Sequence, residues 1–170
     1  MQKKSWCADD SLQERIEYYS PMVYRLAYSL VKSKVDADDI HQEVFIKYIN
    51  KRPCFENAEH EKAWFIRVTV NQCKSWWKTA WRQRFVSLSE YEEEGRELAV
   101  SGDGLLDDGH EVIEKVKLLS PKYRIVIHLF YYEQLSVEEI ARILGQKSST
   151  VRTHLTPARR KLSELLKEDV

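Results

Sequence analysis

The 170-residue sequence has few residues that interrupt helices, with five glycines and four prolines. Its apolar residues recur at steps of three and four instead of alternating, so we expect an all-α protein. The sequence also lacks an apolar run long enough to cross a membrane, and its first four residues are not followed by the core of a signal peptide. We therefore expect a cytoplasmic protein without membrane insertion.

Cysteine is scarce as well, and the three that occur are far apart. Cys7, Cys54 and Cys73 form no Cys-x-x-Cys pair, which predicts reduced, structural cysteines. His60 together with Cys54 and Cys73 does not have the spacing of metal ligands, and no phosphate-binding loop or nucleophile motif is present. The sequence therefore indicates no metal, no cofactor and no enzymatic activity.

The net charge of zero hides an uneven distribution of charge along the chain. Residues 1–85 hold 15 basic and 11 acidic side chains, and residues 115–170 hold 11 basic and six acidic ones. Between them, residues 86–114 hold one basic and ten acidic side chains. Two mildly basic halves joined by a strongly acidic segment suit two nucleic-acid-facing domains on a solvated tether.

The first half has the pattern of three helices, over residues 11–33, 36–51 and about 61–84. The second of these has Asp36 as a candidate N-cap. Its predicted inward face consists of Val44, Phe45, Tyr48 and Ile49. The third helix has an apolar stripe of Ile66, Val70, Cys73, Trp77 and Trp81. Residues 53–61 read as a polar loop, and residues 86–110 as a linker rich in glycine and acids.

The second half begins with a helix from Val112, followed by a helix with Ser120 as N-cap and Pro121 at its first position. Residues 135–166 then have the pattern of two short helices joined by a tight turn. Ser136 and Glu139 match a capping box, and Gly145 can adopt the left-handed conformation that ends a helix.

The last helix combines an apolar stripe with a basic face. Ser148 or Ser149 is its candidate cap. The apolar stripe consists of Val151, Leu155, Ala158, Leu162 and Leu165. Arg and Thr side chains occupy the opposite face, which is the arrangement that a helix in the DNA major groove requires. We predict a DNA-binding helix-turn-helix; the alternative is a helical hairpin with a solvated basic face.

In this order and at this spacing, the motifs resemble the extracytoplasmic-function (ECF) sigma factors, the two-domain subunits that direct RNA polymerase to promoters. Residues 38–45 resemble the core-polymerase-binding helix of that family. Residues 63–68, running into 71–74, resemble the helix that faces the minus-ten element. Residues 119–124 and 135–162 resemble the domain that reads the minus-thirty-five element.

The resemblance implies two small helical domains. Residues 1–85 would form a region 2-like domain and residues 111–170 a region 4-like helix-turn-helix domain, joined by an acidic linker over residues 86–110. It also implies that the chain binds core RNA polymerase, at the β′ clamp helices and the β flap, and promoter DNA at a stress- or signal-responsive set of genes. Members of the family are commonly held by an anti-sigma factor, so we expect such a partner.

The resemblance further implies residue roles in the first half. The predicted contacts with core polymerase are Asp38, Asp39, Gln42 and Glu43; a solvated acidic face is the alternative. A pocket for a base pulled out of the minus-ten duplex would be formed by Glu56, Asn57 and Glu59. The strand phosphates would be held by Arg67, Asn71, Lys74 and Lys78. Trp76 is the best candidate for stacking on single-stranded DNA, although an aromatic stripe is more often core.

In the second half, the predicted contacts with the minus-thirty-five element are Ser148, Ser149, Thr150, Arg152, Thr153, Thr156, Arg159 and Arg160. One departure from the family pattern lies among them, because Pro157 stands inside the reading helix where the family usually has a basic residue. Proline removes a helical hydrogen bond and costs about 3 kcal/mol in a regular helix interior. We expect a kink or an altered path beyond Thr156.

A competing interpretation is a stand-alone transcriptional regulator that uses the helix-turn-helix without entering polymerase. Its first half would then be a ligand-sensing or dimerising module. The order of the motifs in residues 38–78 argues against this interpretation.

Overall fold

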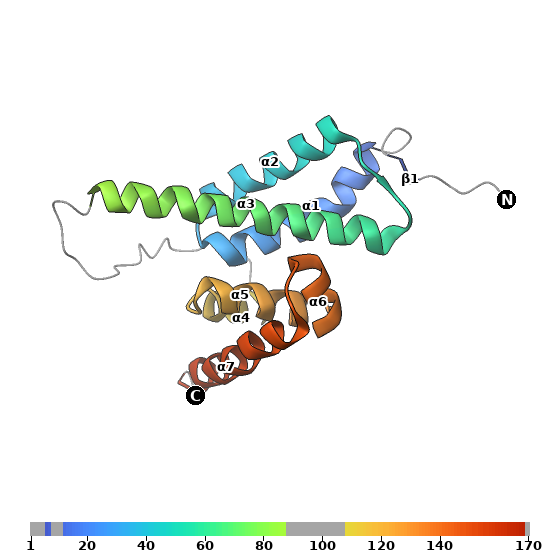
Figure 1. Ribbon diagram of the computed structural model, residues 1–170. Helices are drawn as coiled ribbons and strands as arrows, with labels where there is room; N and C mark the ends of the chain where they lie inside the picture. Colours follow the sequence, from blue (N-terminus) through green and yellow to red (C-terminus); the bar gives the residue numbers. More distant parts are fainter. Residues whose placement is uncertain (1–5, 8–11, 88–107, 169–170) are drawn as a thin grey trace.

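The first half of the chain forms three packed helices, α1 (Leu12–Val31), α2 (Lys34–Lys51) and α3 (Ala58–Ser87) (Figure 1). The computed structural model describes residues 6–7, 12–87 and 108–168. Two short antiparallel strands, β1 (Trp6–Cys7) and β2 (Cys54–Phe55), pair Trp6 with Phe55 and Cys7 with Cys54. The all-α prediction is confirmed apart from this small ladder, and no described helix is long and apolar enough to span a membrane.

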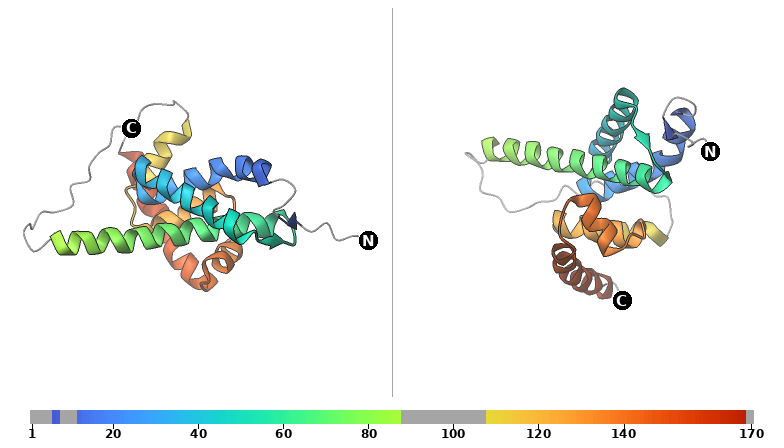
Figure 2. Two further views of the ribbon diagram at one scale, coloured as in Figure 1. Left: turned by 90° about the horizontal axis from the view of Figure 1, so that it is seen from above. Right: turned by 45° about the vertical axis from the view of Figure 1, so that its right-hand side comes forward.

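The second half contains α4 (Asp108–Val116), α5 (Pro121–Ile127), a π-helical turn η1 (His128–Tyr132), α6 (Val137–Leu144) and α7 (Ser148–Lys167). These elements lie against one side of α1 and α3, as Figure 1 and the right-hand view of Figure 2 show. The buried apolar side chains of both halves belong to one cluster. Most of the predicted linker, residues 88–107, lies outside the described residues.

The start of α2 corrects one predicted cap. Ser33, not Asp36, is the N-cap: it has an extended backbone, and its hydroxyl accepts a hydrogen bond from the backbone N–H of Asp36 at 3.4 Å. Lys32 has a φ of 68°, so α1 ends at Val31, two residues before its predicted end, and α2 begins at Lys34, two residues before its predicted start. Asp36 therefore lies in the first turn of α2, where a negative charge is still favourable.

Two further corrections concern side chains that were placed on the inward face or at a cap. Ile49 is 39% exposed, because one residue beyond the buried Tyr48 the helix has turned by about 100° toward solvent. The N-cap of α7 is Lys147, without a side-chain cap hydrogen bond, and Ser148 is already helical. The capping box of α6 and the left-handed Gly145, with a φ of 65°, are confirmed.

The cysteines do not all match the prediction of reduced thiols. Cys54 is disulfide-bonded, so the prediction is wrong at that position. The reason lies in the ladder of β1 and β2, which pairs the backbone of Cys54 with that of Cys7 and which the scattered positions in the sequence do not reveal. Cys73 is free and buried in the core, and burial raises the pKa of its thiol to about 12, so it is a structural residue.

Candidate polymerase and promoter interfaces

The exposed side of α2 carries the residues predicted to contact core polymerase. Asp38, Asp39, Gln42 and Glu43 are all exposed. The opposite side of the helix is buried, with Val44 at 0% and Phe45 at 6% exposure. His41 fastens α2 to α1 through its Nε2, which lies 2.6 Å from the hydroxyl of Ser20. The helix therefore presents the four polar side chains from a rigid support.

Two apolar residues also lie on this exposed side: Ile46, to which the sequence analysis gave no role, and Ile49, which it placed on the inward face. Ile46 is 48% exposed and Ile49 is 39% exposed. They follow Gln42 at steps of four and three, so they extend the same side of α2 by two turns. The available signal was the position of Ile46 off the buried stripe. Exposed apolar side chains rimmed by charged ones are typical of a protein-binding surface.

The residues predicted to form the base pocket lie at the start of α3, which begins three residues before the predicted position. Glu56 and Asn57 precede the helix and Glu59 lies in its first turn, and all three are exposed. Asn57 Oδ1 accepts a hydrogen bond from the backbone N–H of His60 at 2.8 Å, so Asn57 caps α3. His60 Nδ1 in turn accepts from the backbone N–H of Glu56 at 3.3 Å. The loop is thus held in shape by its own side chains.

The start of α3 is also held in place by an ion pair with α1. Glu61, which was predicted to end the loop, is buried in the first turn of α3 and 2% exposed. Its Oε1 accepts a hydrogen bond from Arg15 of α1 at 2.6 Å. Burial by itself lowers the pKa of Arg15, but the hydrogen bond and charge of Glu61 outweigh it, and the pKa lies above its ordinary value. This ion pair orients the predicted base pocket on the core.

The predicted phosphate-binding residues lie along one side of α3 at steps of four, three and four. Arg67, Asn71 and Lys78 are exposed, and Lys74 is half-buried. At Arg67 this side contacts the second half, because the guanidinium Nε of Arg67 donates to the carbonyl oxygen of Ile143 in α6 at 3.1 Å. Trp76 is half-buried and packs against the core, so it has one covered and one accessible side.

The helix-turn-helix presents the first turns of α7 to solvent. Ser149, Arg152, Thr153, Thr156 and Arg160 are exposed, whereas Ser148 and Thr150 are half-buried. Below them, Val151 and Leu155 are buried against α5 and α6. Arg152 forms an ion pair with Glu138 of α6, with 2.9 Å between its guanidinium nitrogen and the carboxylate oxygen.

The part of α7 beyond Thr156 differs from its first turns in the contacts that its arginines make. The helix continues through the half-buried Pro157 to Lys167. The guanidinium of Arg159 lies 4.6 Å from the ring centroid of Phe130 and 5.7 Å from that of Tyr131. Both Arg159 and Arg160 are exposed; Arg159 lies over aromatic rings of the second half, and Arg160 has no such ring contact in the described structure.

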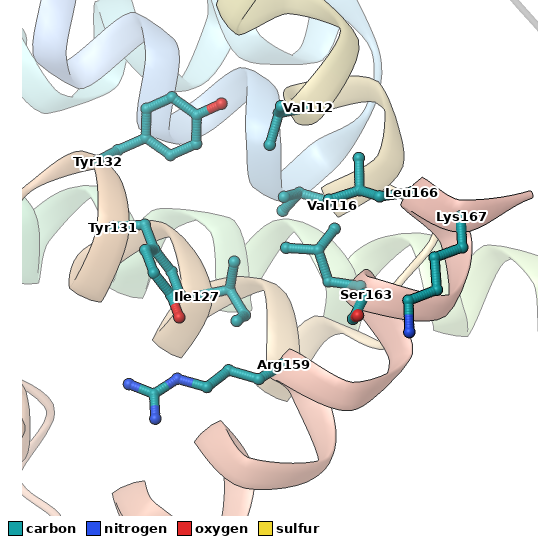
Figure 3. A pocket seen from close by; sticks show the side chains of 10 residues that line it. Val112, Val116, Ile127, Tyr131, Tyr132, Arg159, Ser163, Leu166 and Lys167 are labelled. Carbon is teal, nitrogen blue, oxygen red and sulfur yellow. The ribbon is translucent and has the colours of Figure 1, made fainter. Parts of the chain in front are cut away.

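A cavity of about 520 Å³ opens next to Arg159 and was not predicted from the sequence (Figure 3). It lies between α4, the end of α5 with η1, and the C-terminal part of α7. Its apolar walls are formed by Val112, Val116, Ile127, Leu162 and Leu166. Arg159 and Lys167 contribute positive charge to its lining. An apolar groove with basic residues beside it fits a segment that combines apolar and acidic side chains.

Comparison with known proteins agrees with this arrangement. Residues 15–83 match the family model of sigma-70 region 2, and residues 110–162 match that of sigma-70 region 4. RNA polymerase sigma factor SigV of Bacillus subtilis is 33% identical over 151 residues, covering 86% of each chain. The RNA polymerase sigma-E factor of Streptomyces coelicolor is 29% identical over 154 residues, covering 91% of this chain and 85% of the relative.

A solved structure extends the likeness to the whole fold. The sigma factor RpoE of Bartonella quintana, in a co-crystal with the anti-sigma factor NepR, matches with a TM-score of 0.73 and 26% identity. The match covers 94% of this chain and 98% of the other. Region 2, region 4 and their order are those of the sigma-70 proteins, which bind core RNA polymerase and direct transcription initiation. The chain belongs to the ECF sigma factors of that family. The alternative of a stand-alone regulator is not favoured.

Proposed function

We propose that the exposed side of α2 is the surface through which this sigma factor binds the β′ clamp helices of core polymerase. Asp38, Asp39, Gln42 and Glu43 would supply charged and amide hydrogen bonds. Ile46 and Ile49 would form the apolar part of the contact. The observation that carries this proposal is the two-sided character of α2, whose far side is buried while its near side combines charge with two exposed isoleucines.

We also propose that the two halves read different promoter elements. In the region 2-like half, Glu56, Asn57 and Glu59 would receive a base of the minus-ten element, and Arg67, Asn71, Lys74 and Lys78 would hold its backbone. In the region 4-like half, the first turns of α7 would enter the major groove at the minus-thirty-five element. Because Arg159 lies over aromatic rings of the protein, we propose that it makes no DNA contact and that Arg160 contacts a DNA phosphate.

The cavity beside Arg159 is the proposed contact of the β flap. It belongs to the second half alone, so the flap and the clamp helices would bind the two halves independently. The protein would act in the cytoplasm, where core polymerase is found, and contribute no catalytic step of its own. Because the relative from Bartonella quintana was crystallised with the anti-sigma factor NepR, we propose that an anti-sigma factor also controls this protein in response to a stress or signal.

Co-purification with core polymerase tests the assignment of α2. Asp39→Arg should greatly weaken the association while the protein keeps its fold, because an exposed side chain carries little folding energy. Ile49→Asp should weaken it as well if the isoleucines belong to the surface. Glu17→Arg is the matched control, since Glu17 is an exposed acid on the neighbouring α1. Binding of Asp39→Arg at the level of the parent protein would refute the assignment.

A further inference from the structure

The disulfide at Cys54 is a feature of the first half that the proposed function does not use. Cys54 is disulfide-bonded, and of the other two cysteines in the chain Cys73 is free. The remaining cysteine is Cys7, whose backbone pairs with that of Cys54 in the ladder of β1 and β2 (Figure 1). The protein would act in the cytoplasm, whose small thiols keep most protein cysteines reduced. Disulfides that form there are usually transient and often sense the redox state.

The exposure of Cys54 suits a bond that forms and breaks. Cys54 is exposed, whereas the next residue, Phe55, is only 5% exposed. A disulfide is reduced when a thiolate attacks one of its sulfur atoms, and exposed disulfides are the labile ones. The free Cys73 is the opposite case, because it is buried and its thiol has a pKa raised to about 12 by that burial. Cys54 is therefore accessible to small redox reagents, and Cys73 is inert.

The disulfide lies next to the proposed base pocket. Glu56 and Asn57 follow Cys54 by two and three positions. Asn57 is fixed by its cap on α3, and the backbone N–H of Glu56 donates to Nδ1 of His60 at 3.3 Å. The ring of His60 in turn meets that of Phe55, with 5.4 Å between the centroids. The start of α3 thus holds the pocket residues at one end, and the ladder at Cys54 holds them at the other.

The ladder is too short to persist without a cross-link. It consists of two residue pairs, Trp6 with Phe55 and Cys7 with Cys54. A small two-stranded ladder is marginally stable at best in water, and pairing segments this far apart in the chain costs loop-closure entropy. A disulfide reduces that cost, because it closes the same loop in the unfolded chain. Reduction therefore releases β1 and frees the segment that leads into the pocket.

We propose that Cys7 and Cys54 form a reversible disulfide, a redox switch that holds the minus-ten base pocket ready when oxidised and loosens it when reduced. The proposal rests on the role proposed for Glu56, Asn57 and Glu59. It makes this sigma factor more selective for its promoters under oxidising conditions, without a change in its amount.

A peroxide is the oxidant that the switch requires. The thiolate of Cys54 attacks one oxygen of hydrogen peroxide, the O–O bond breaks, and a sulfenic acid and hydroxide form. The sulfur of Cys7 then attacks the sulfur of Cys54, so that the S–S bond forms, the S–O bond breaks and the oxygen leaves as water. Two thiols and one peroxide thus give one disulfide and two waters. Two small thiols reverse the bond by exchange and leave as their own disulfide.

The first experiment measures the bond itself on the full chain, by alkylation in urea and mass spectrometry. The oxidised chain should take up one label, at Cys73, and the reduced chain three. A glutathione buffer of cytoplasmic potential should open the bond, and hydrogen peroxide should restore it. Reduction should lower the melting temperature of the parent by roughly 5–15 °C. Cys7→Ser and Cys54→Ser should melt at the reduced value in both buffers.

The second experiment measures promoter selection from a library randomised at the minus-ten element. The sigma factor is oxidised or reduced, freed of reagent and then added to core polymerase without oxygen, so that polymerase itself meets no reagent. The oxidised parent should discriminate between minus-ten sequences by roughly five- to thirtyfold more than the reduced parent, the effect of ordering one residue of backbone. Cys54→Ser should match the reduced parent after either treatment, and Cys73→Ala, the matched cysteine control, should keep the difference.

Three outcomes would overturn the switch. They are a bond that stays closed in the glutathione buffer, a bond that persists in Cys7→Ser, and equal promoter selection by the oxidised and reduced parent. The pocket role is tested separately by Glu56→Ala. If the two redox forms differ in selection but Glu56→Ala leaves the minus-ten preference of the oxidised form unchanged, the switch stands and the role proposed for Glu56 fails.

Discussion

Arg152 is the residue whose replacement tests the reading helix most directly. It is exposed in the first turns of α7, and in the free protein it is paired with Glu138 at 2.9 Å. On DNA this guanidinium would have to leave the carboxylate and donate to a base edge. Arg152→Ala removes the base contact, whereas Glu138→Gln removes the competing carboxylate. The two replacements are therefore expected to act in opposite directions.

The magnitudes follow from exposure and geometry. A lost arginine–base contact costs about 1–3 kcal/mol, or roughly 5- to 150-fold in affinity, and relaxes the preference at one base pair. The ion pair has side chains that are 59% and 60% exposed, and such pairs are worth about 0.2–1 kcal/mol. Glu138→Gln should thus strengthen DNA binding by no more than about fivefold. The loss at Arg152 should exceed the gain at Glu138.

The assay is selection of promoters by the reconstituted holoenzyme from a library randomised at the minus-thirty-five element, at two salt concentrations. Arg160→Ala is the control, because a phosphate contact is lost evenly over all sequences and lowers the salt slope by about one. If Arg152→Ala weakens all sequences evenly, or if Arg160→Ala changes the preferred base, α7 is oriented differently from our proposal.

The remaining two predictions concern stability. Burial places the pKa of His128 below its ordinary value of 6.5, so the unfolded chain takes up a proton first as the pH falls. The free energy of unfolding should therefore decrease below about pH 6.5, by up to about 1.4 kcal/mol per pH unit. Urea titrations from pH 7.5 to 5.5 should show a smaller decrease for His128→Leu than for the parent protein or for His60→Gln, the control at an exposed histidine. Gly145→Ala should lower the free energy of unfolding by about 1 kcal/mol through backbone strain alone, since the φ is 65° and no atom lies within 4 Å of the added Cβ. An unchanged melting temperature would contradict this. Gly145→Asn should lower the stability less, because asparagine tolerates this conformation.

The elements of the fold were largely accessible from the sequence, because each depends on neighbouring residues. The capping box of Ser136 and Glu139 involves residues three positions apart, and both of its hydrogen bonds form, at 3.1 and 2.7 Å. The N-cap of α2 was predicted wrongly, although it too depends on neighbouring residues. Whether Ser33 or Asp36 caps the helix depends on the left-handed Lys32 before it, and lysine is not a residue that signals this conformation.

Features that depend on distant residues were not accessible in this way. The pairing of Cys54 with the strand at Cys7 joins positions far apart in the chain, and nothing in their spacing indicates it. The cavity beside Arg159 depends on how α4 packs against α7. Its walls come from residues whose separate patterns only mark them as apolar faces. The predicted interfaces were recognised through family motifs, which place residues on a helix without defining their contacts.

The side of α3 shows why charge patterning predicts a surface more readily than its occupant. Arg67, Lys74 and Lys78 recur on one side of the helix, and a row of cations is expected to attract anions. In the free protein, however, the group that Arg67 holds is a backbone carbonyl, and the neighbouring Lys62 holds a carboxylate from the second half. A nucleic-acid phosphate and these oxygen atoms satisfy the same donors. The charge pattern of α3 therefore predicts that this side binds oxygen acceptors, but it does not distinguish a DNA phosphate from a carbonyl or carboxylate oxygen of the same chain.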